Sequence, residues 1–161
     1  MNHQRVKKQV FTALMVAISV VMGRFFLIPI PWTHGNVNLC DLGIMVTALL
    51  IGPLAGGIVG GLSGMTLDLI SGYAAYAPFS LLAHGLEGLV IGYLHQKTHN
   101  RYLALGGGVL VMVVGYFFAD SILYTITAGA LGLGTNFLQG LIGTGITLVV
   151  IPALHRAIRT S

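Results

Sequence analysis

One long stretch of the chain, residues 36–94, is apolar on every side of any helix that it could form. It is dense in glycine and reads NVNLCDLGIMVTALLIGPLAGGIVGGLSGMTLDLISGYAAYAPFSLLAHGLEGLVIGYL. A helix in a soluble domain has one apolar face, whereas a helix that is apolar all round is buried or faces lipid. The stretch contains three acids, Asp41, Asp68 and Glu87, each isolated within an apolar run. Ionisable groups in such surroundings are costly and usually have a function.

The composition of the whole chain points to an integral membrane protein. Only 7% of its 161 residues are charged, whereas globular domains contain about 25% charged residues. The length fits one membrane domain, residues 1–161, because each span needs about 20 residues. The net charge of +4 is explained by orientation rather than by nucleic acid, because the basic residues lie at the predicted membrane edges. The single cysteine, Cys40, excludes an internal disulfide and argues against a cysteine-based metal site.

Turn residues divide the chain into six predicted membrane spans of an all-α bundle. The first span follows a basic segment without a convincing signal-peptide cleavage site, so we expect it to be uncleaved. Pro29 and Pro31 end this span, and the glycine-rich segment 128–136 is expected to turn the chain into the last span. The predicted spans are residues 8–28, 39–51, 54–70, 78–94, 102–126 and 137–154.

The basic residues test this number of spans. With six spans, seven of the eight Lys and Arg residues lie on the side of the membrane that both termini share, and none lies in the opposite loops. An excess of Lys and Arg marks the cytoplasmic side. Five or seven spans would spoil this separation. The sequence therefore predicts that both termini are cytoplasmic.

All four acids of the chain are predicted to lie in the outer half of the membrane, together with two buried bases, Arg24 and His84. At about 1.5 Å per helical residue, His84 and Glu87 lie about 9–14 Å below the outer end of the fourth span. Asp120 lies at a similar depth in the fifth span, while Asn136 and Gln139 open the sixth span from outside. This sorting predicts a wet or ligand-filled cavity that is open to the exterior.

His84 and Glu87 are three residues apart and therefore share a helix face. A His-x-x-Glu pair can ligate metal in a helical bundle, but further Glu residues on other helices are then needed. The chain has a single Glu, so no metal is expected. Two other interpretations stay open: a hydrogen-bonded polar cluster with Arg24 as its counter-ion, and a ligand-binding site.

Small residues at a spacing of four occur in two predicted spans. Gly56, Gly60 and Gly64 form such a row in the third span, where it would let two helix backbones approach closely. Ala13 and Ala17 have the same spacing in the first span, and internal packing is the default interpretation. The chain contains no G-x-x-x-x-G-K-[ST] segment, so it is not an ATPase of the phosphate-loop type.

Three aromatic residues, Trp32, Tyr73 and Tyr76, lie in the predicted outer loops. Aromatic belts at the membrane surface explain most residues of this kind. These three would also sit over the proposed cavity, where they could stack on a planar ligand.

Residues 36–94, together with the later segments GYFFADSILY and NFLQGLIG, resemble the S components of energy-coupling factor (ECF) vitamin transporters. The resemblance is to the group named after its riboflavin transporters. The Gly-Pro turn at residues 52–53 and the segment APFSLLAHGLEGL carry most of it. The family commonly has Lys where this chain has His84, which changes the charge of the pocket and weakens the case for riboflavin itself.

The resemblance implies a six-helix protein in the plasma membrane of a prokaryote that captures a vitamin from outside. Its implied partners are a transmembrane coupling (T) subunit and two ATP-binding cassette ATPases, which would hydrolyse the ATP. No enzymatic activity and no cofactor are implied for the chain itself. In this family small residues of the first helix contact the coupling subunit, which favours this role for Ala13 and Ala17.

The predicted pocket offers many hydrogen-bond acceptors and few fixed positive charges. It suits a neutral or weakly cationic ring with hydroxymethyl groups, and chains like this one resemble the S components linked to pyridoxine and hydroxymethylpyrimidine. An anion such as pantothenate would need more positive charge than Arg24 supplies. The candidate substrate-binding residues are Trp32, Asn38, Asp41, Tyr73, Tyr76, His84, Glu87, Asp120, Asn136 and Gln139.

Two other functions stay open on the sequence. A stand-alone proton-coupled carrier would use Asp68, Glu87 or Asp120 as its proton site, although its proton relay should then continue into the inner half of the membrane. An intramembrane metalloenzyme would use His84, Glu87 and Asp120 together.

Overall fold

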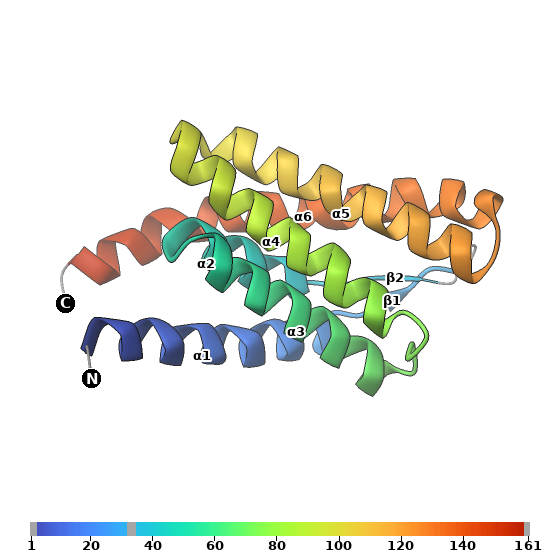
Figure 1. Ribbon diagram of the computed structural model, residues 1–161, viewed down its shortest axis with the longest axis horizontal. Helices are drawn as coiled ribbons and strands as arrows, with labels where there is room; N and C mark the ends of the chain where they lie inside the picture. The colour runs from blue at the N-terminus through green and yellow to red at the C-terminus, as the bar shows by residue number, and fades with distance from the viewer. Residues whose placement is uncertain (1–2, 32–34, 160–161) are drawn as a thin grey trace.

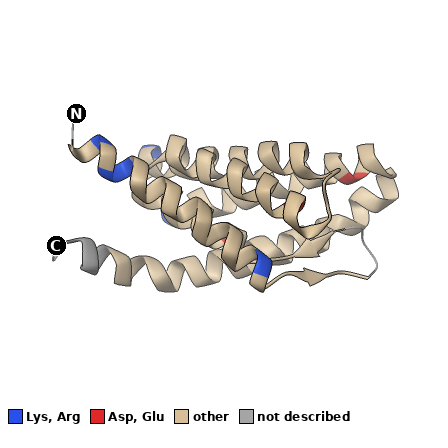
Figure 2. Cartoon of the chain, turned by 90° about the horizontal axis from the view of Figure 1, so that it is seen from below, with Lys and Arg blue, Asp and Glu red and all other residues tan. Residues whose placement is uncertain are grey.

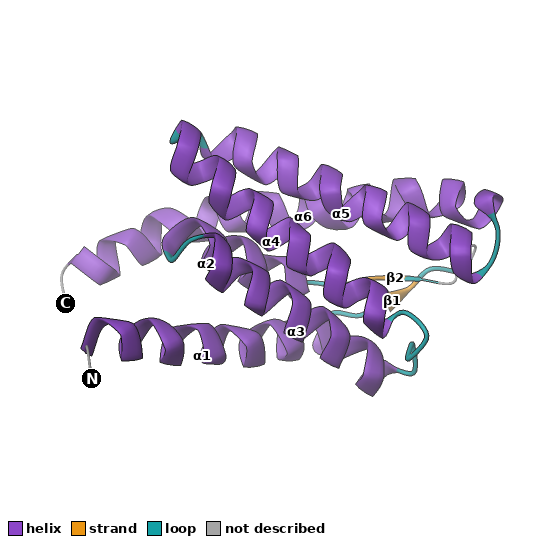
Figure 3. Ribbon diagram, viewed as in Figure 1, coloured by secondary structure: helices purple, strands orange, loops and turns teal. Residues whose placement is uncertain are grey.

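The computed structural model describes residues 3–31 and 35–159, which form six helices and one short pair of strands (Figure 1). Short loops and turns connect each helix from α2 to α6 to the next one (Figure 3). The helices are α1 (His3–Phe25), α2 (Cys40–Leu50), α3 (Pro53–Ser71), α4 (Ala77–Thr98), α5 (Arg101–Leu123) and α6 (Ile126–Arg159), and the strands are β1 (Ile28–Pro29) and β2 (Asn36–Val37).

The shortest helix, α2, lies at the centre of the bundle. Nine of its 11 residues are buried, and it contacts α1, α3, α4 and α6. A helix of this length extends about 17 Å, which is too short to cross a hydrocarbon core of about 30 Å. Its neighbours shield it on nearly all sides.

Within the described residues, the other five helices are each long and apolar enough to cross a membrane. Large apolar side chains cover their outer surfaces, among them Leu54, Leu82, Leu110 and Val149. Soluble monomers rarely expose contiguous apolar surfaces of this kind. The prediction of an all-α membrane bundle is confirmed.

The prediction that residues 128–136 turn the chain is wrong. This glycine-rich segment is helical and belongs to α6, and the chain reverses instead at Tyr124 and Thr125. The glycines make room for α5: a Cβ atom on Gly129 would meet the backbone of Phe117. Small residues at such contacts favour close helix packing in membranes, so glycine here marks a helix contact rather than a helix end.

Other predicted boundaries differ by a few residues. α1 begins five residues before the predicted residue 8 and ends at Phe25, while α5 ends at Leu123 rather than at residue 126. Part of the predicted loop after α1 is a β-hairpin, in which Ile28 pairs with Val37 in antiparallel register. The pattern of apolar residues did not indicate this hairpin, because each strand has only two residues.

Helices α3 and α4 approach each other closely through glycine. A Cβ atom on Gly88 of α4 would meet the backbone of Gly56, and one on Gly60 of α3 would meet the backbone of His84. Gly56 and Gly60 belong to the predicted row of small residues, whose packing role is thereby confirmed.

Both termini lie at one end of the bundle, together with the turns that join α2 to α3 and α4 to α5 (Figure 1). Most Lys and Arg residues gather toward this end, while the acids lie away from it (Figure 2). Arg24 is an exception, since it lies in the last turn of α1 and its side chain is exposed. The prediction of a buried Arg24 is therefore wrong.

Replacing Gly88 with Ala should destabilise the protein, because the added Cβ atom meets backbone that cannot rotate away. Overpacking of this kind lowers the free energy of unfolding by about 1–3 kcal/mol. Gly106→Ala is the matched control, because a Cβ atom there meets nothing within 4 Å. Thermal unfolding of the purified variants in detergent measures the difference, and equal stabilities would contradict the close contact of α3 with α4.

Candidate ligand-binding site

A small polar cavity lies at the end of the bundle opposite the termini, where the hairpin, the α3–α4 loop and helices α5 and α6 meet. Its volume is ≈ 30 Å³, enough for about two water molecules. The cavity is lined by Gly35, Asn36, Asn38, Asp68, Tyr73, Tyr76, Tyr116, Asp120, Gly132, Thr135, Asn136 and Gln139.

A short hydrogen bond joins two elements across the cavity lining. The Tyr76 hydroxyl, just before α4, donates to Asp120 Oδ1 in the last turn of α5 at 2.5 Å. Burial, together with the hydrogen bond to Asp120, raises the pKa of Tyr76 well above its usual range, so the phenol stays protonated and acts as the donor. The rings of Tyr73 and Tyr124 pack against Tyr76 with centroids 6.5 and 6.2 Å away.

A second aromatic side chain connects the cavity to the bundle interior. Tyr116 of α5 lines the cavity, and its hydroxyl lies 2.6 Å from that of Ser80 in α4. The edge of its ring also meets the ring of His84, with centroids 5.4 Å apart. Tyr116 therefore separates the cavity from the charged groups beneath it.

These charged groups form a buried cluster around His84. Nδ1 of His84 lies 2.8 Å from Glu87 Oε2, one helical turn along α4, and 3.4 Å from Asp41 Oδ1 at the start of α2. Asp41 and Glu87 are fully buried, and His84 is 2% exposed. Buried polar groups require partners, and in this cluster Nδ1 of His84 lies close to both carboxyl groups. Arg24, which the sequence analysis offered as counter-ion, is exposed at the end of α1.

Gln139 of α6 connects the cavity to the cluster. Its Nε2 donates to Asp41 Oδ1 at 3.2 Å, and its Oε1 accepts from the backbone N–H of Asn38 at 2.9 Å. The Asn38 side chain in turn accepts from the backbone N–H of Cys40 at 2.9 Å, the local turn that asparagine favours. These bonds fix where α2 begins and so hold Asp41 against His84.

The structure places the predicted binding residues at two depths. Asp41, His84 and Glu87 form the buried cluster beneath the cavity, and Trp32 lies outside the described residues. The remaining six predicted residues line the cavity: Asn38, Tyr73, Tyr76, Asp120, Asn136 and Gln139.

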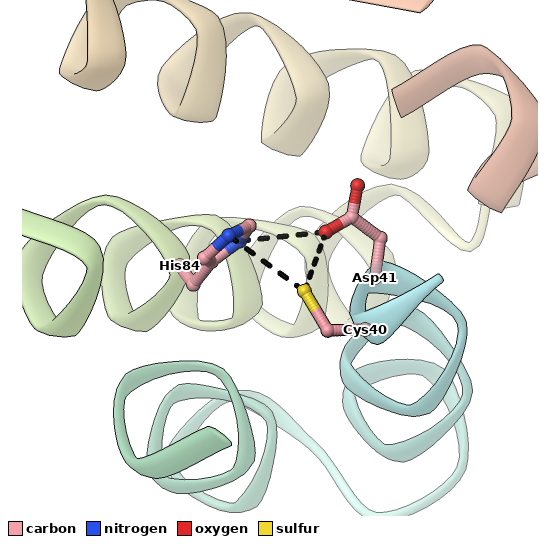
Figure 4. Close-up of side chains that lie close together, drawn as sticks. All are labelled: Cys40, Asp41 and His84. Carbon is pink, nitrogen blue, oxygen red and sulfur yellow. Dashed lines mark hydrogen bonds and ion pairs between the residues drawn. The ribbon is translucent and has the colours of Figure 1, made fainter. Parts of the chain in front are cut away.

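Two details of the prediction are corrected. Asn136 and Gln139 do not open the last helix; they lie ten and 13 residues after its first residue, Ile126. Asp120 does not share a set of possible metal ligands with His84. The described residues that do bring ligand atoms together are Cys40, Asp41 and His84 (Figure 4).

Some cavity residues were not predicted to bind a ligand. Asp68 near the end of α3 and Tyr116 of α5 both line the cavity, but the sequence analysis considered Asp68 only as a proton site and did not single out Tyr116. An acid inside an apolar helix is the signal that could have identified Asp68. Tyr116 carries no such signal, because tyrosine is common at membrane surfaces.

Comparison with known proteins agrees with this architecture. Residues 3–156 match the family model of the ECF-type riboflavin transporter S component. The thiamine precursor transporter HmpT of Lactococcus lactis subsp. cremoris is 35% identical over 157 residues, which are 97% of this chain and 92% of the relative. An uncharacterized protein of Pyrococcus woesei is 42% identical over 100 residues, or 60% of this chain and 67% of the relative.

The fold also matches a solved structure. The crystal structure of the S component for biotin from an ECF-type ABC transporter superposes with a TM-score of 0.61 and covers 97% of this chain and 94% of that one. At 24% sequence identity, this likeness shows the fold alone.

The family match decides between a transport subunit and an enzyme. S components are the substrate-binding subunits of transporters rather than enzymes, so the alternative of an intramembrane metalloenzyme is set aside. The resemblance seen in the sequence is confirmed along nearly the whole chain, because the match begins at residue 3 and ends at residue 156. The chain belongs to the ECF-type riboflavin transporter S component family.

Proposed function

We propose that this chain captures a pyrimidine precursor of thiamine, hydroxymethylpyrimidine, for an ATP-driven ECF-type importer. The observation that carries this proposal is the chemistry of the cavity. Two carboxyl groups, four carboxamides and three phenols line it, and none of the lining residues described is Lys or Arg. Such a lining suits an uncharged or weakly cationic ring, and the similarity to a thiamine precursor transporter supports the same class of ligand.

Each part of a hydroxymethylpyrimidine has a suitable partner in this cavity. Its amino and hydroxymethyl groups can donate to carboxylates such as Asp120, and its ring nitrogens can accept from the carboxamides of Asn136 and Gln139. Tyr73 and Tyr76 can cover the ring. Pyridoxine is the second candidate, because it also presents hydroxymethyl groups on a small aromatic ring.

Ligand entry requires the cavity to widen. Pockets for small molecules have volumes of about 300–1,000 Å³, far above the ≈ 30 Å³ of this cavity. We infer that the loop carrying Tyr73 and Tyr76 moves outward, which breaks the hydrogen bond from Tyr76 to Asp120. The ligand would then take the place of the tyrosine hydroxyl at Asp120. Asp41, His84 and Glu87 would act from beneath, through Gln139.

We propose that residues 1–161 form one membrane domain with six membrane spans. Both termini would lie in the cytoplasm of a prokaryotic cell. The gathering of Lys and Arg toward the end with the termini supports this orientation (Figure 2). The cavity would then face the exterior, where a vitamin is captured. Because α2 is short and central, its crossing would depend on the helices around it.

The proposed partners are a transmembrane coupling subunit and two ATP-binding cassette ATPases. The side chains of Ala13 and Ala17 on α1 are exposed, which does not support internal packing as their role. Ala13 also lines a groove between α1 and α3, together with Arg5 and Leu54. Small residues on an exposed helix face allow another helix to approach closely, as docking of a coupling subunit would require.

Native mass spectrometry of the gently purified chain tests the choice of ligand. We expect an adduct with the mass of hydroxymethylpyrimidine that exchanges with the added compound. Pyridoxine, added in equal amount, should displace it poorly. Preferential retention of pyridoxine would overturn the ranking of the two ligands, and retention of riboflavin would contradict both.

Replacing Asp120 with Asn or Asn136 with Ala should weaken binding of hydroxymethylpyrimidine. Loss of a hydrogen bond to a charged group costs about 1.5–3 kcal/mol, which corresponds to about a 10- to 100-fold loss of affinity for Asp120→Asn. Ser121→Ala is the matched control, because the Ser121 hydroxyl bonds to the Phe117 carbonyl within α5 and does not line the cavity. Isothermal titration in detergent gives the affinities. Unchanged affinity in both cavity variants would rule out this site.

Replacing Ala13 and Ala17 with Leu should prevent assembly with the coupling subunit while leaving vitamin binding intact. The larger side chains would hold the partner helix away from α1. Ala130→Leu, at an exposed alanine of α6, is the matched control and should assemble normally. Co-purification of the four-subunit complex measures assembly, and loss of vitamin binding in the Ala13 and Ala17 variants would instead indicate a role in packing.

A further inference from the structure

The buried cluster beneath the cavity contains donor atoms of three chemical kinds. Cys40 contributes a thiol, Asp41 a carboxylate and His84 an imidazole, and one ligand atom of each lies within 4.8 Å of the others (Figure 4). Cys40 and Asp41 begin α2, while His84 lies in the middle of α4. The three side chains therefore converge on one point between two packed helices.

The spacing of these atoms fits a bound metal ion. Tetrahedral coordination with bonds of about 2.3 Å to sulfur and about 2.1 Å to nitrogen and oxygen separates the ligand atoms by about 3.4–3.6 Å. Cys40 Sγ lies 3.4 Å from Asp41 Oδ1 and 3.8 Å from His84 Nε2. Both distances from the sulfur are therefore close to those of a tetrahedral site, and the three ligand atoms all lie within 4.8 Å of one another.

Glu87 and Gln139 orient the ligands as the outer partners of a metal site do. Glu87 Oε2 lies 2.8 Å from Nδ1 of His84 and can accept a hydrogen bond from an Nδ1–H group. In that tautomer Nε2 carries the lone pair, which is directed at Cys40. A carboxylate behind a ligating histidine is the common arrangement in metal sites. Gln139 likewise donates to Asp41 Oδ1 at 3.2 Å, which holds that carboxylate in place.

The cluster contains two buried carboxyl groups and a single imidazole. Asp41 and Glu87 are fully buried, and within residues 3–31 and 35–159 neither Asp41 Oδ2 nor Glu87 Oε1 has a hydrogen-bond partner. Two carboxylates thus share one imidazole, and Arg24 is exposed elsewhere. Unpaired buried carboxylate oxygens are costly, and a cation at this point would compensate them.

We propose that Cys40, Asp41 and His84 bind one divalent transition-metal ion of the zinc class. Thiolate and imidazole ligands select such ions over Mg²⁺ and Ca²⁺, which prefer oxygen. On binding, the Cys40 S–H bond breaks, its proton leaves to solvent and the thiolate sulfur bonds to the metal. Three protein ligands leave a fourth coordination position for water or another donor.

The metal site is distinct from the vitamin-binding cavity and goes beyond the proposed function. It would connect α2 to α4 directly beneath the cavity floor. The site could be occupied whether or not the cavity takes a pyrimidine, so each proposal can fail alone.

Cobalt titration of the purified chain tests the metal site. The chain is stripped with a chelator in detergent and titrated with Co²⁺ while its absorption spectrum is recorded. We expect one Co²⁺ per chain, visible d–d bands and a near-ultraviolet band from charge transfer between thiolate and cobalt. Added Zn²⁺ should displace the cobalt and abolish these bands.

Three variants separate the ligands from their surroundings. Cys40→Ser should abolish the charge-transfer band, and His84→Gln provides a second, independent loss of binding. Glu87→Gln should retain the band but weaken Co²⁺ binding by about 10- to 100-fold, as expected for an outer partner. Asp120→Asn is the control that loses vitamin affinity and keeps the metal. Size-exclusion profiles establish which variants remain folded.

The absence of stoichiometric cobalt binding by the unaltered chain would overturn the proposal. So would a Cys40→Ser variant, folded by its elution profile, that binds Co²⁺ with unchanged affinity and spectrum. Either result leaves the vitamin proposal standing, because its titrations use Asp120 and Asn136, which line the cavity and are not among the proposed metal ligands.

Discussion

The architecture depends on holding ionisable side chains inside an apolar bundle. His84 lies between Asp41 and Glu87, with its Nδ1 3.4 and 2.8 Å from their carboxylates. In surroundings of low polarity such contacts are strong, and an unpaired partner is costly. The polar end of α2 is therefore tied to the middle of α4, and apolar residues of α2 such as Ile44 and Met45 fill the centre of the core. The cavity lies directly above these contacts, so the proposed ligand site and the central packing share one support.

Close packing of α3 on α4 makes this support rigid. Gly60 of α3 leaves room for the backbone of His84 itself, so the residue at the centre of the charged cluster is also a point of helix contact. A side chain at position 60 would displace His84 from Asp41 and Glu87. The small residues of α3 thus position the polar groups as well as the helices. This connection explains why glycine and isolated acids occur together in the same part of the chain.

Much of this arrangement could be predicted from the sequence, because membrane surroundings impose strict rules. Apolar runs predicted the helices, and the isolation of Glu87 and Asp120 within such runs marked them as candidates for the site. The start of α6 was predicted wrongly, because the glycines of residues 128–136 indicate a turn in water but allow close packing in a bundle. The contact of Cys40 with His84 could not be predicted either, because it joins residues 44 positions apart and depends on how α2 inserts among its neighbours.

In the proposed mode of binding, the hydrogen bond between Tyr76 and Asp120 also divides the affinity for a ligand between opening of the loop and contact with the ligand. A ligand that needs this bond broken binds only the fraction of molecules in which the loop is already open, and its apparent dissociation constant rises in inverse proportion to that fraction. The intrinsic affinity of the open cavity for its ligand must therefore exceed the apparent affinity that is measured in solution. The same bond re-forms when the ligand leaves, and it then competes with rebinding. The apparent affinity for the ligand is therefore lower than the contacts in the open cavity alone would give. A lower apparent affinity suits a transport subunit that must release the ligand it has bound.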